Sequence, residues 1–187
     1  MKNVFIFLAL SIVVLFSTGT ALGKETLEEV IDISSKSATI KYDLAYPGIL
    51  PNNPLYKLKV LRDKITALLI SDPLKRAEFY LLQTDKGILA TAMLVDKGEA
   101  KLAGETALKT EHNMTLLTYE LKRITKKPNS DFINKLKTAS LKHQEVLSSL
   151  IERVAPDEQK TFTTVVNFSK TNLETIEKFE KKKFLAN

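Results

Sequence analysis

The sequence contains no cysteine and no tryptophan, and it has only two histidines, six glycines and six prolines among 187 residues. The absence of cysteine excludes disulfides, thiolate metal sites, a cysteine nucleophile and a lipidated N-terminal cysteine. With 44% hydrophobic and 27% charged residues, the composition is that of an ordinary folded protein. The excess of 28 Lys and Arg over 22 Asp and Glu is mild, and it falls short of the basic density typical of nucleic-acid-binding proteins. We therefore expect no nucleic-acid partner.

The first 23 residues have the three-part pattern of a secretory signal peptide. Lys2 supplies a positive start, residues 4–16 are almost entirely apolar, and the small residues Ala21 and Gly23 fit a signal peptidase site. We predict cleavage after Gly23 and export of the protein, either into the medium or to the outer face of the cytoplasmic membrane and cell envelope. The alternative is an uncleaved anchor, because residues 4–22 are just long enough to cross a bilayer.

A polar arm and a Pro-rich segment separate the signal peptide from the rest of the chain. Residues 24–45 are predicted to form the arm, which becomes extended near its end, where apolar and charged residues alternate. The Pro-rich segment, residues 46–56, is called the clasp below. Its prolines restrict the backbone, and Gly48 after Pro47 suits a type II turn. The clasp is therefore stiff as well as apolar, and we expect it to lie along a groove between helices.

Two interpretations of the clasp remain open. It either only tethers the first helix, or it presents a recognition surface, as stiff Pro-rich segments do in other proteins. In the second case the expected partner is an envelope or extracellular protein of unknown identity. The candidate partner-binding residues are Tyr46, Pro47, Leu50, Pro51, Pro54 and Tyr56.

After the clasp, apolar residues recur at helical spacing between sharp breaks. Asn53 and Pro54 predict the start of a helix over about residues 54–71, and Asp72 with Pro73 repeats the same cap-and-proline start. Later breaks are expected at Gly98, Pro128 and Pro156. Each predicted helix carries an apolar stripe, which is typical of a helix that packs against a core. On the first helix the stripe consists of Leu58, Leu61, Ile65, Leu68 and Leu69.

Short connections between the predicted helices force sequential helices to be antiparallel neighbours. The predicted fold is therefore all-α: an up-and-down antiparallel bundle of about five helices over residues 46–187, preceded by an extended Pro-rich arm. We expect four long helices and a shorter one docked on them. Gly87 and Gly104 lie inside predicted helices, where glycine is unfavourable. We predict that both are positions of close packing between helices.

Residues that could carry catalysis or bind a metal are few and scattered. His143 lies on the apolar stripe of the fourth predicted helix without a second ligand one turn away, so it is predicted to be a satisfied core or boundary histidine. His112 lies opposite the stripe of its helix and is predicted to be solvated. The sequence has no Glu-x-x-His pair, no nucleophile motif and no Gly-rich phosphate loop. We expect a protein that is not an enzyme, with no catalytic residue, metal or cofactor.

A basic C-terminal cluster offers a different surface. Lys181, Lys182 and Lys183 stand beside Phe184 and Leu185. Such a cluster favours contact with an anionic surface, whereas the simpler interpretation is a fraying, solvated helix end. The alternative function is therefore that of a peripheral membrane or envelope-polymer binding protein that uses these basic helix ends.

Three runs of sequence carry a resemblance to a known family. They are Pro-Gly-x-Leu-Pro-x-x-Pro-Leu-Tyr at 47–56, Leu-Lys-Val-Leu-Arg-Asp-Lys-Ile at 58–65 and Asp-Pro-Leu-Lys-Arg-Ala-Glu at 72–78. They resemble the uncharacterised secreted prokaryotic family known as domain of unknown function family 5667. The resemblance implies a Pro-rich segment after a signal peptide, followed by long helices. It implies no activity, cofactor or catalytic residue, and the expected function is a non-catalytic secreted or cell-surface helical module for interaction or structure.

Overall fold

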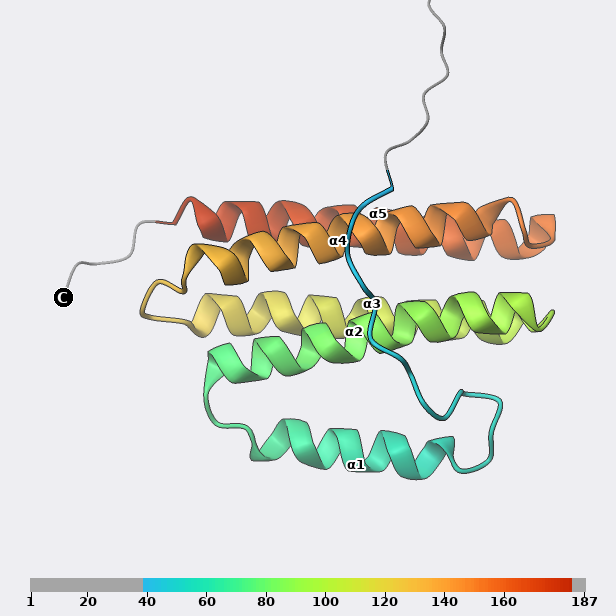
Figure 1. The fold of residues 1–187 in the computed structure, drawn as a ribbon, viewed down its shortest axis with the longest axis horizontal. Helices are drawn as coiled ribbons and strands as arrows, with labels where there is room; N and C mark the ends of the chain where they lie inside the picture. The colour runs from blue at the N-terminus through green and yellow to red at the C-terminus, as the bar shows by residue number, and fades with distance from the viewer. Residues whose placement is uncertain (1–38, 183–187) are drawn as a thin grey trace, which may run out of the picture. The chain divides into compact units, whose positions relative to one another are not determined.

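The computed structural model describes residues 39–182, so the signal peptide, most of the arm and Lys183 lie outside the described residues. The described chain forms five α-helices and no strand, which confirms the predicted all-α fold (Figure 1). The helices are α1 (Tyr56–Leu69), α2 (Pro73–Asp96), α3 (Ala100–Arg123), α4 (Ser130–Ile151) and α5 (Pro156–Glu180).

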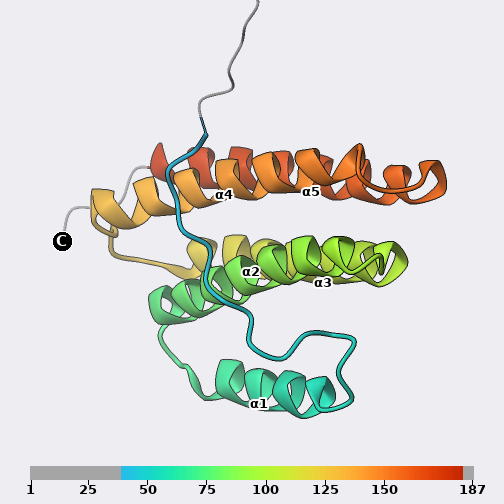
Figure 2. The same cartoon turned by 45° about the vertical axis from the view of Figure 1, so that its right-hand side comes forward.

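Helices α2 to α5 form a four-helix bundle in two layers. α2 packs along α3, α4 packs along α5, and the two pairs meet through α3 with α5 and α2 with α4. Figures 1 and 2 show the two layers from different sides, with short turns joining antiparallel helices. The shorter α1 lies outside this bundle, beside α2 and on the side away from α4 and α5.

Side-chain caps fix the starts of two of the long helices, and the first of these caps, Asp72, is the one expected from the sequence. The carboxylate of Asp72 accepts a hydrogen bond from the backbone N–H of Lys75 at 3.0 Å, and α2 begins immediately afterwards. The side chain of Asn129 does the same for the N–H of Phe132 at 2.8 Å at the start of α4. Gly98 separates α2 from α3 with a φ of +76°, a conformation that favours glycine. Local sequence therefore dictates where the bundle helices begin and turn.

Helix α1 begins two residues later than the sequence predicts. The side chain of Asn53 accepts a hydrogen bond from the N–H of Leu55 at 2.9 Å, so it closes a turn and does not cap the helix. Pro54 lies in that turn, and α1 begins at Tyr56. Earlier in the clasp, Gly48 has a φ of +69°, which agrees with the predicted type II turn.

The core of the bundle is divided into two apolar halves, one towards each end. One half contains Ala77, Leu81, Met114, Leu117, Leu121, Ile124, Phe132, Ile133, Leu136, Ala139, Ile176 and Phe179. The other contains Ile88, Leu94, Val95, Ala103, Ala107, Leu147, Leu150, Val154, Phe162, Val165 and Val166. On each of the four helices the two sets are separated in sequence, and buried polar residues occupy the interval.

These intervening side chains form a polar layer across the middle of the bundle. Nε2 of His143 in α4 lies 2.7 Å from Oδ1 of Asp85 in α2. The amide nitrogen of Asn172 in α5 donates to Oε1 of Glu111 in α3 at 2.6 Å. The hydroxyl of Tyr42, from the chain before the clasp, donates to Oδ2 of Asp85 at 2.8 Å. Buried polar groups must keep their partners, so the layer opposes sliding of one helix along another.

Both glycines inside helices are close-packing positions, as predicted. A Cβ added to Gly87 in α2 would lie 2.0 Å from Oγ1 of Thr110 in α3. A Cβ added to Gly104 in α3 would lie 3.1 Å from Cγ2 of Thr161 in α5. Between Gly87 and Thr110 there is no room for a side chain. At Gly104 a methyl group would require only a small shift of Thr161.

Candidate docking surface

Helix α1 presents its apolar side to solvent. None of its residues is buried, in contrast to every helix of the bundle. The prediction that its stripe packs against a core is therefore wrong. The five residues of the α1 stripe and their exposed fractions are Leu58 (65%), Leu61 (56%), Ile65 (49%), Leu68 (81%) and Leu69 (78%).

The opposite side of α1 is attached to the clasp. Nζ of Lys59 donates a hydrogen bond to the carbonyl oxygen of Pro47 at 2.8 Å and lies 5.2 Å from the ring centre of Tyr56. Burial is the main cause that lowers the pKa of Lys59, and burial also raises the pKa of Tyr56. These contacts turn the side of α1 that carries Lys59 towards the protein, so the stripe on the other side faces outward.

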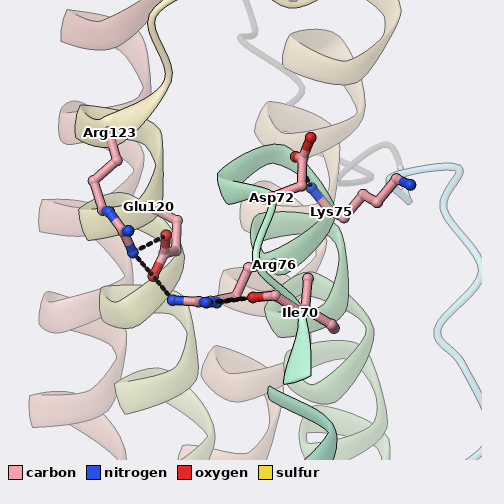
Figure 3. A network of polar contacts seen from close by, with 6 residues as sticks. All are labelled: Ile70, Asp72, Lys75, Arg76, Glu120 and Arg123. Carbon is pink, nitrogen blue, oxygen red and sulfur yellow. Dashed lines mark hydrogen bonds and ion pairs between the residues drawn. The ribbon is translucent and has the colours of Figure 1, made fainter. Parts of the chain in front are cut away.

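The C-terminal end of α1 is held by an arginine of α2, shown in Figure 3. Nε and Nη2 of Arg76 donate to the carbonyl oxygen of Ile70, the residue that follows α1. Nη1 of Arg76 also pairs with Oε1 of Glu120 in α3 at 3.2 Å, and Arg123 binds the same carboxylate at 2.9 Å. The half-buried Arg76 thus connects the end of α1 to two bundle helices. Because α1 is fixed at both ends, the outward direction of its stripe is built into the fold.

The clasp residues predicted to bind a partner are divided between the inside and the outside of the protein. Pro47 and Leu50 are buried, Pro51 and Tyr56 are half-buried, and Tyr46 and Pro54 are exposed. The side-chain amide of Asn52 donates to Oε1 of Glu99 at 2.7 Å, so the clasp reaches the start of α3 as well as α1. The clasp therefore tethers α1 to the bundle, and its exposed residues remain candidates for binding.

The basic C-terminal residues lie elsewhere. Lys181 and Lys182 are exposed at the end of α5, and Lys183 lies outside the described residues. Helix α5 belongs to the layer on the far side of the bundle from α1 (Figures 1 and 2). The structure therefore does not bring these lysines together with the clasp or with α1 into one surface.

The two histidines lie where the sequence predicts, but His143 is satisfied at one ring nitrogen only, because its buried Nδ1 has no hydrogen-bond partner. His143 has no exposed surface and pairs with Asp85, and His112 is exposed. The pair links α4 to α2 within the core, and only its Asp85, 5% exposed, reaches a hollow in the surface. Between residues 39 and 182 no group of three or more His, Asp or Glu side chains could hold a metal ion.

Sequence reasoning missed three buried carboxylates: Asp85, Glu111 and Glu120, the partner of Arg76 and Arg123. Asp85 lies four residues after the core residue Leu81, and Glu111 lies four residues after Ala107. An acidic residue at stripe spacing is the signal that could have found them. Burial raises the pKa of Glu111 to about 7, against the opposing effect of its hydrogen bond from Asn172.

Open hollows on the described surface offer little for chemistry. The wider one lies between α2 and the start of α4, where Leu81 and Phe132 are bordered by Glu78, Asp131 and Lys135. Asp85 also borders it, but both of its carboxylate oxygens are already bonded. In the part of the chain that the structure describes, no helix combines the length and apolar character needed to cross a membrane.

These features define a class of protein: an all-α domain in which a Pro-rich clasp and a separately held amphipathic helix precede a four-helix bundle. The chain belongs to the family described as Domain of unknown function (DUF5667), whose model matches residues 48–182. The match begins inside the clasp and includes all five helices, and it confirms the resemblance seen in the sequence. Among curated proteins and among solved structures, no match to the chain was found.

Proposed function

We propose that this protein is a non-catalytic docking module that acts outside the cytoplasm after export. One observation carries the proposal: the α1 stripe is exposed although hydrogen bonds of Lys59 and Arg76 attach α1 near both of its ends. Contiguous exposed apolar surface on a folded protein is typical of an interaction site. Burial of a fully exposed aliphatic side chain contributes roughly 1.5–3 kcal/mol, and the stripe residues, which are 49–81% exposed, can gain about half of that or more on a binding partner.

The difference in burial between the bundle and α1 supports different roles for the two parts. The bundle has its own apolar core in two halves, and hydrogen bonds between His143 and Asp85 and between Asn172 and Glu111 link its helices, so we expect it to serve as the scaffold. Helix α1 contributes no buried side chain to that core. Its position beside the bundle is therefore better explained by presentation of a surface than by stability of the fold.

The export half of the proposal has a direct test. The intact mass of the native protein would be measured separately in culture medium and in washed envelopes. A mass that begins at Lys24 supports export with cleavage, and a full-length mass in the envelope supports export with a retained anchor. Recovery of the protein only from the cytoplasm contradicts export in either form.

The docking half is tested by sedimentation with isolated envelopes of the producing cells. The test variant is Leu58→Gln/Leu61→Gln/Leu68→Gln in the full chain. The matched control replaces three exposed leucines of α2, α3 and α4, whose exposed fractions are 41%, 40% and 44%: Leu82→Gln, Leu108→Gln and Leu141→Gln. Circular dichroism and thermal melting establish that both variants are folded.

We expect the α1 variant to lose most of its sedimentation while the control variant sediments like the unmodified protein. Equal sedimentation of all three proteins, with folding intact, contradicts docking through α1. Equal loss in both variants also contradicts it, because the effect would then follow surface hydrophobicity in general.

A further inference from the structure

The charges around the α1 stripe are arranged in a definite pattern. At 3.6 residues per turn, Lys57 and Lys64 fall along one edge of the stripe and Arg62 along the other. All three side chains are exposed. The single acidic residue of α1, Asp63, lies on the opposite side of the helix and is much less exposed. An apolar face is thus bordered on both edges by cations.

The net charge of α1 is strongly positive for its length. Its 14 residues contain Lys57, Lys59, Arg62 and Lys64 against Asp63, which gives 4 − 1 = +3. Arg62 pairs with Asp63 at 2.7 Å, but 66% of the arginine side chain is exposed. An exposed ion pair of this kind contributes little, so the guanidinium remains available to another anion.

We propose that α1 lies in the interface of an anionic phospholipid membrane, with its stripe among the outer acyl chains and Lys57, Arg62 and Lys64 at the lipid phosphates. This inference rests on the proposed docking function and names its partner. Amphipathic helices that lie in the plane of a membrane combine an apolar face with basic residues. Long Lys and Arg side chains at the edges of such a face extend their charges into the headgroup layer while their stems stay in apolar surroundings.

Charge also decides between a membrane and a second copy of the chain. If two α1 stripes packed face to face, the basic edges of one helix would meet the basic edges of the other, and like charges repel at that distance. An anionic bilayer presents the opposite sign along both edges at once. The stripe runs for about 18 Å along the outside of α1, and the soft surface of a bilayer can surround it without a preformed groove.

The fold sets the orientation of the protein on the membrane. Lys59 holds one end of α1 and Arg76 holds the other. Helix α1 lies beside α2, on the outer side of the α2–α3 layer (Figures 1 and 2). With α1 in the membrane plane, the bundle lies flat on the surface, with α2 and α3 nearer to the lipid and with α4 and α5 facing away.

The absence of cysteine allows the position of α1 to be measured directly. Leu61→Cys in the full chain would carry an environment-sensitive fluorophore, and Leu141→Cys in α4 is the control position. Vesicles would be either pure phosphatidylcholine or an equal mixture of phosphatidylcholine and phosphatidylglycerol. Every version has the same residues 1–38, so binding by that segment is common to all, whereas the fluorophore reports on α1 itself.

We expect the probe at residue 61 to brighten and shift to the blue with anionic vesicles only, and to be quenched by acyl-chain quenchers. The probe at residue 141 should not respond. A second comparison removes three positive charges, either at α1 in Lys57→Gln/Arg62→Gln/Lys64→Gln or on α4 and α5 in Lys135→Gln/Lys160→Gln/Lys170→Gln, all exposed residues. The α1 variant should lose roughly a hundredfold in the partition constant that the residue-61 probe reports, and the control should change far less.

Several results would overturn the inference, and they separate it from the proposed function. If envelope sedimentation depends on α1 but the residue-61 probe ignores anionic vesicles, docking stands and the partner is a protein or polymer of the envelope. If the probe responds equally to neutral vesicles, or if both charge variants behave alike, the basic edges have no specific role. A blue shift that grows with protein concentration in the absence of vesicles means that a second copy covers the stripe. If neither envelopes nor vesicles engage α1, both proposals fail.

Discussion

Helices α1 and α3 carry the same kind of apolar stripe, but the stripe of α3 is buried and that of α1 is exposed. In α3, Met114, Leu117 and Leu121 are at most 1% exposed, whereas the α1 stripe is 49–81% exposed. The difference does not come from spacing or residue type, because both stripes are aliphatic residues three and four apart. It comes from the neighbours: α3 lies between α2 and α5, and α1 meets the clasp with its other side. Helical periodicity therefore tells which residues share a face, and it leaves open what that face contacts.

The largest expected loss of stability comes from shortening a leucine of the buried α3 stripe, and the same change in the α1 stripe tests the comparison. Leu117→Ala in α3 should lower the free energy of unfolding by about 3 kcal/mol, because it removes a fully buried side chain and leaves a cavity. Leu61→Ala in α1 should change it by less than about 0.5 kcal/mol, as is usual at exposed sites. Urea unfolding measures both. A loss at residue 61 comparable to that at residue 117 would mean that the α1 stripe belongs to a core.

The polar layer, which α1 lacks, gives the next largest effect. The pKa of Glu111 is raised from 4.5 to about 7 by burial, so the folded state binds the proton more tightly than the unfolded state. The stability that this group contributes is complete below pH 4.5 and is lost as the pH rises to about 7, in total by about 3 kcal/mol. Glu111→Gln should remove this loss.

The measurement is the difference in unfolding free energy between Glu111→Gln and the unmodified protein across that pH range. Glu105→Gln, at a half-exposed glutamate of the same helix, is the control. The unfolding free energy of Glu111→Gln relative to the unmodified protein should rise with pH. The corresponding difference for Glu105→Gln should not change with pH in the same way. A flat difference at residue 111 would show that its carboxyl titrates normally.

Close helix contact is a further feature that distinguishes the bundle from α1. Gly87→Ala places a methyl group 2.0 Å from Oγ1 of Thr110, and this overlap should lower stability by roughly 1–3 kcal/mol despite the better helix propensity of alanine. Gly104→Ala meets only a side-chain methyl at 3.1 Å and should be nearly neutral. Thermal melting distinguishes the two. Equal melting temperatures would indicate that α2 and α3 lie farther apart at Gly87 than the structure has them.

The smallest expected change in overall stability comes from weakening the attachment of α1 to the bundle. Arg76→Gln removes the donors to the Ile70 carbonyl and the contact with Glu120, and it should lower stability by about 1 kcal/mol. Amide hydrogen exchange in the last turn of α1 should accelerate, while exchange in α3 stays slow. Lys75→Gln, an exposed neighbour in the same helical turn, is the control. Unchanged exchange in α1 would show that Arg76 does not hold the helix.

Much of the fold could be predicted from the sequence because its signals are local. Asp72 with Pro73, and Gly98, act within a few residues of themselves, so helix starts and turns follow from the chain alone. The late start of α1 escaped prediction because Asn53 can cap either a helix or a turn, and the conformation of the clasp decides which. The buried histidine was found from its stripe position, whereas its partner Asp85 was not, because the two residues come together only when α2 packs against α4.

The candidate site shows the same division. The clasp was recognised from its prolines, but burial of Pro47 and Leu50 depends on the elements that cover them. The α1 stripe was recognised as one face of a helix and was assigned the wrong environment. The sequence of α1 does not reveal that Lys59 binds a carbonyl of the clasp. It also does not reveal that Arg76 of α2 binds the carbonyl of Ile70.

The sequence by itself determined the all-α class, the breaks between helices, the family and the set of residues on each helix face, because these depend on backbone preferences and on the period of the α-helix. Only the tertiary structure decided which faces are covered, since burial depends on neighbours that are distant in sequence. It joined Tyr42, Asp85 and His143 into one hydrogen-bonded group and turned the stripe of α1 away from the bundle. The scaffold is therefore encoded in local pattern, and the candidate docking surface is a product of packing.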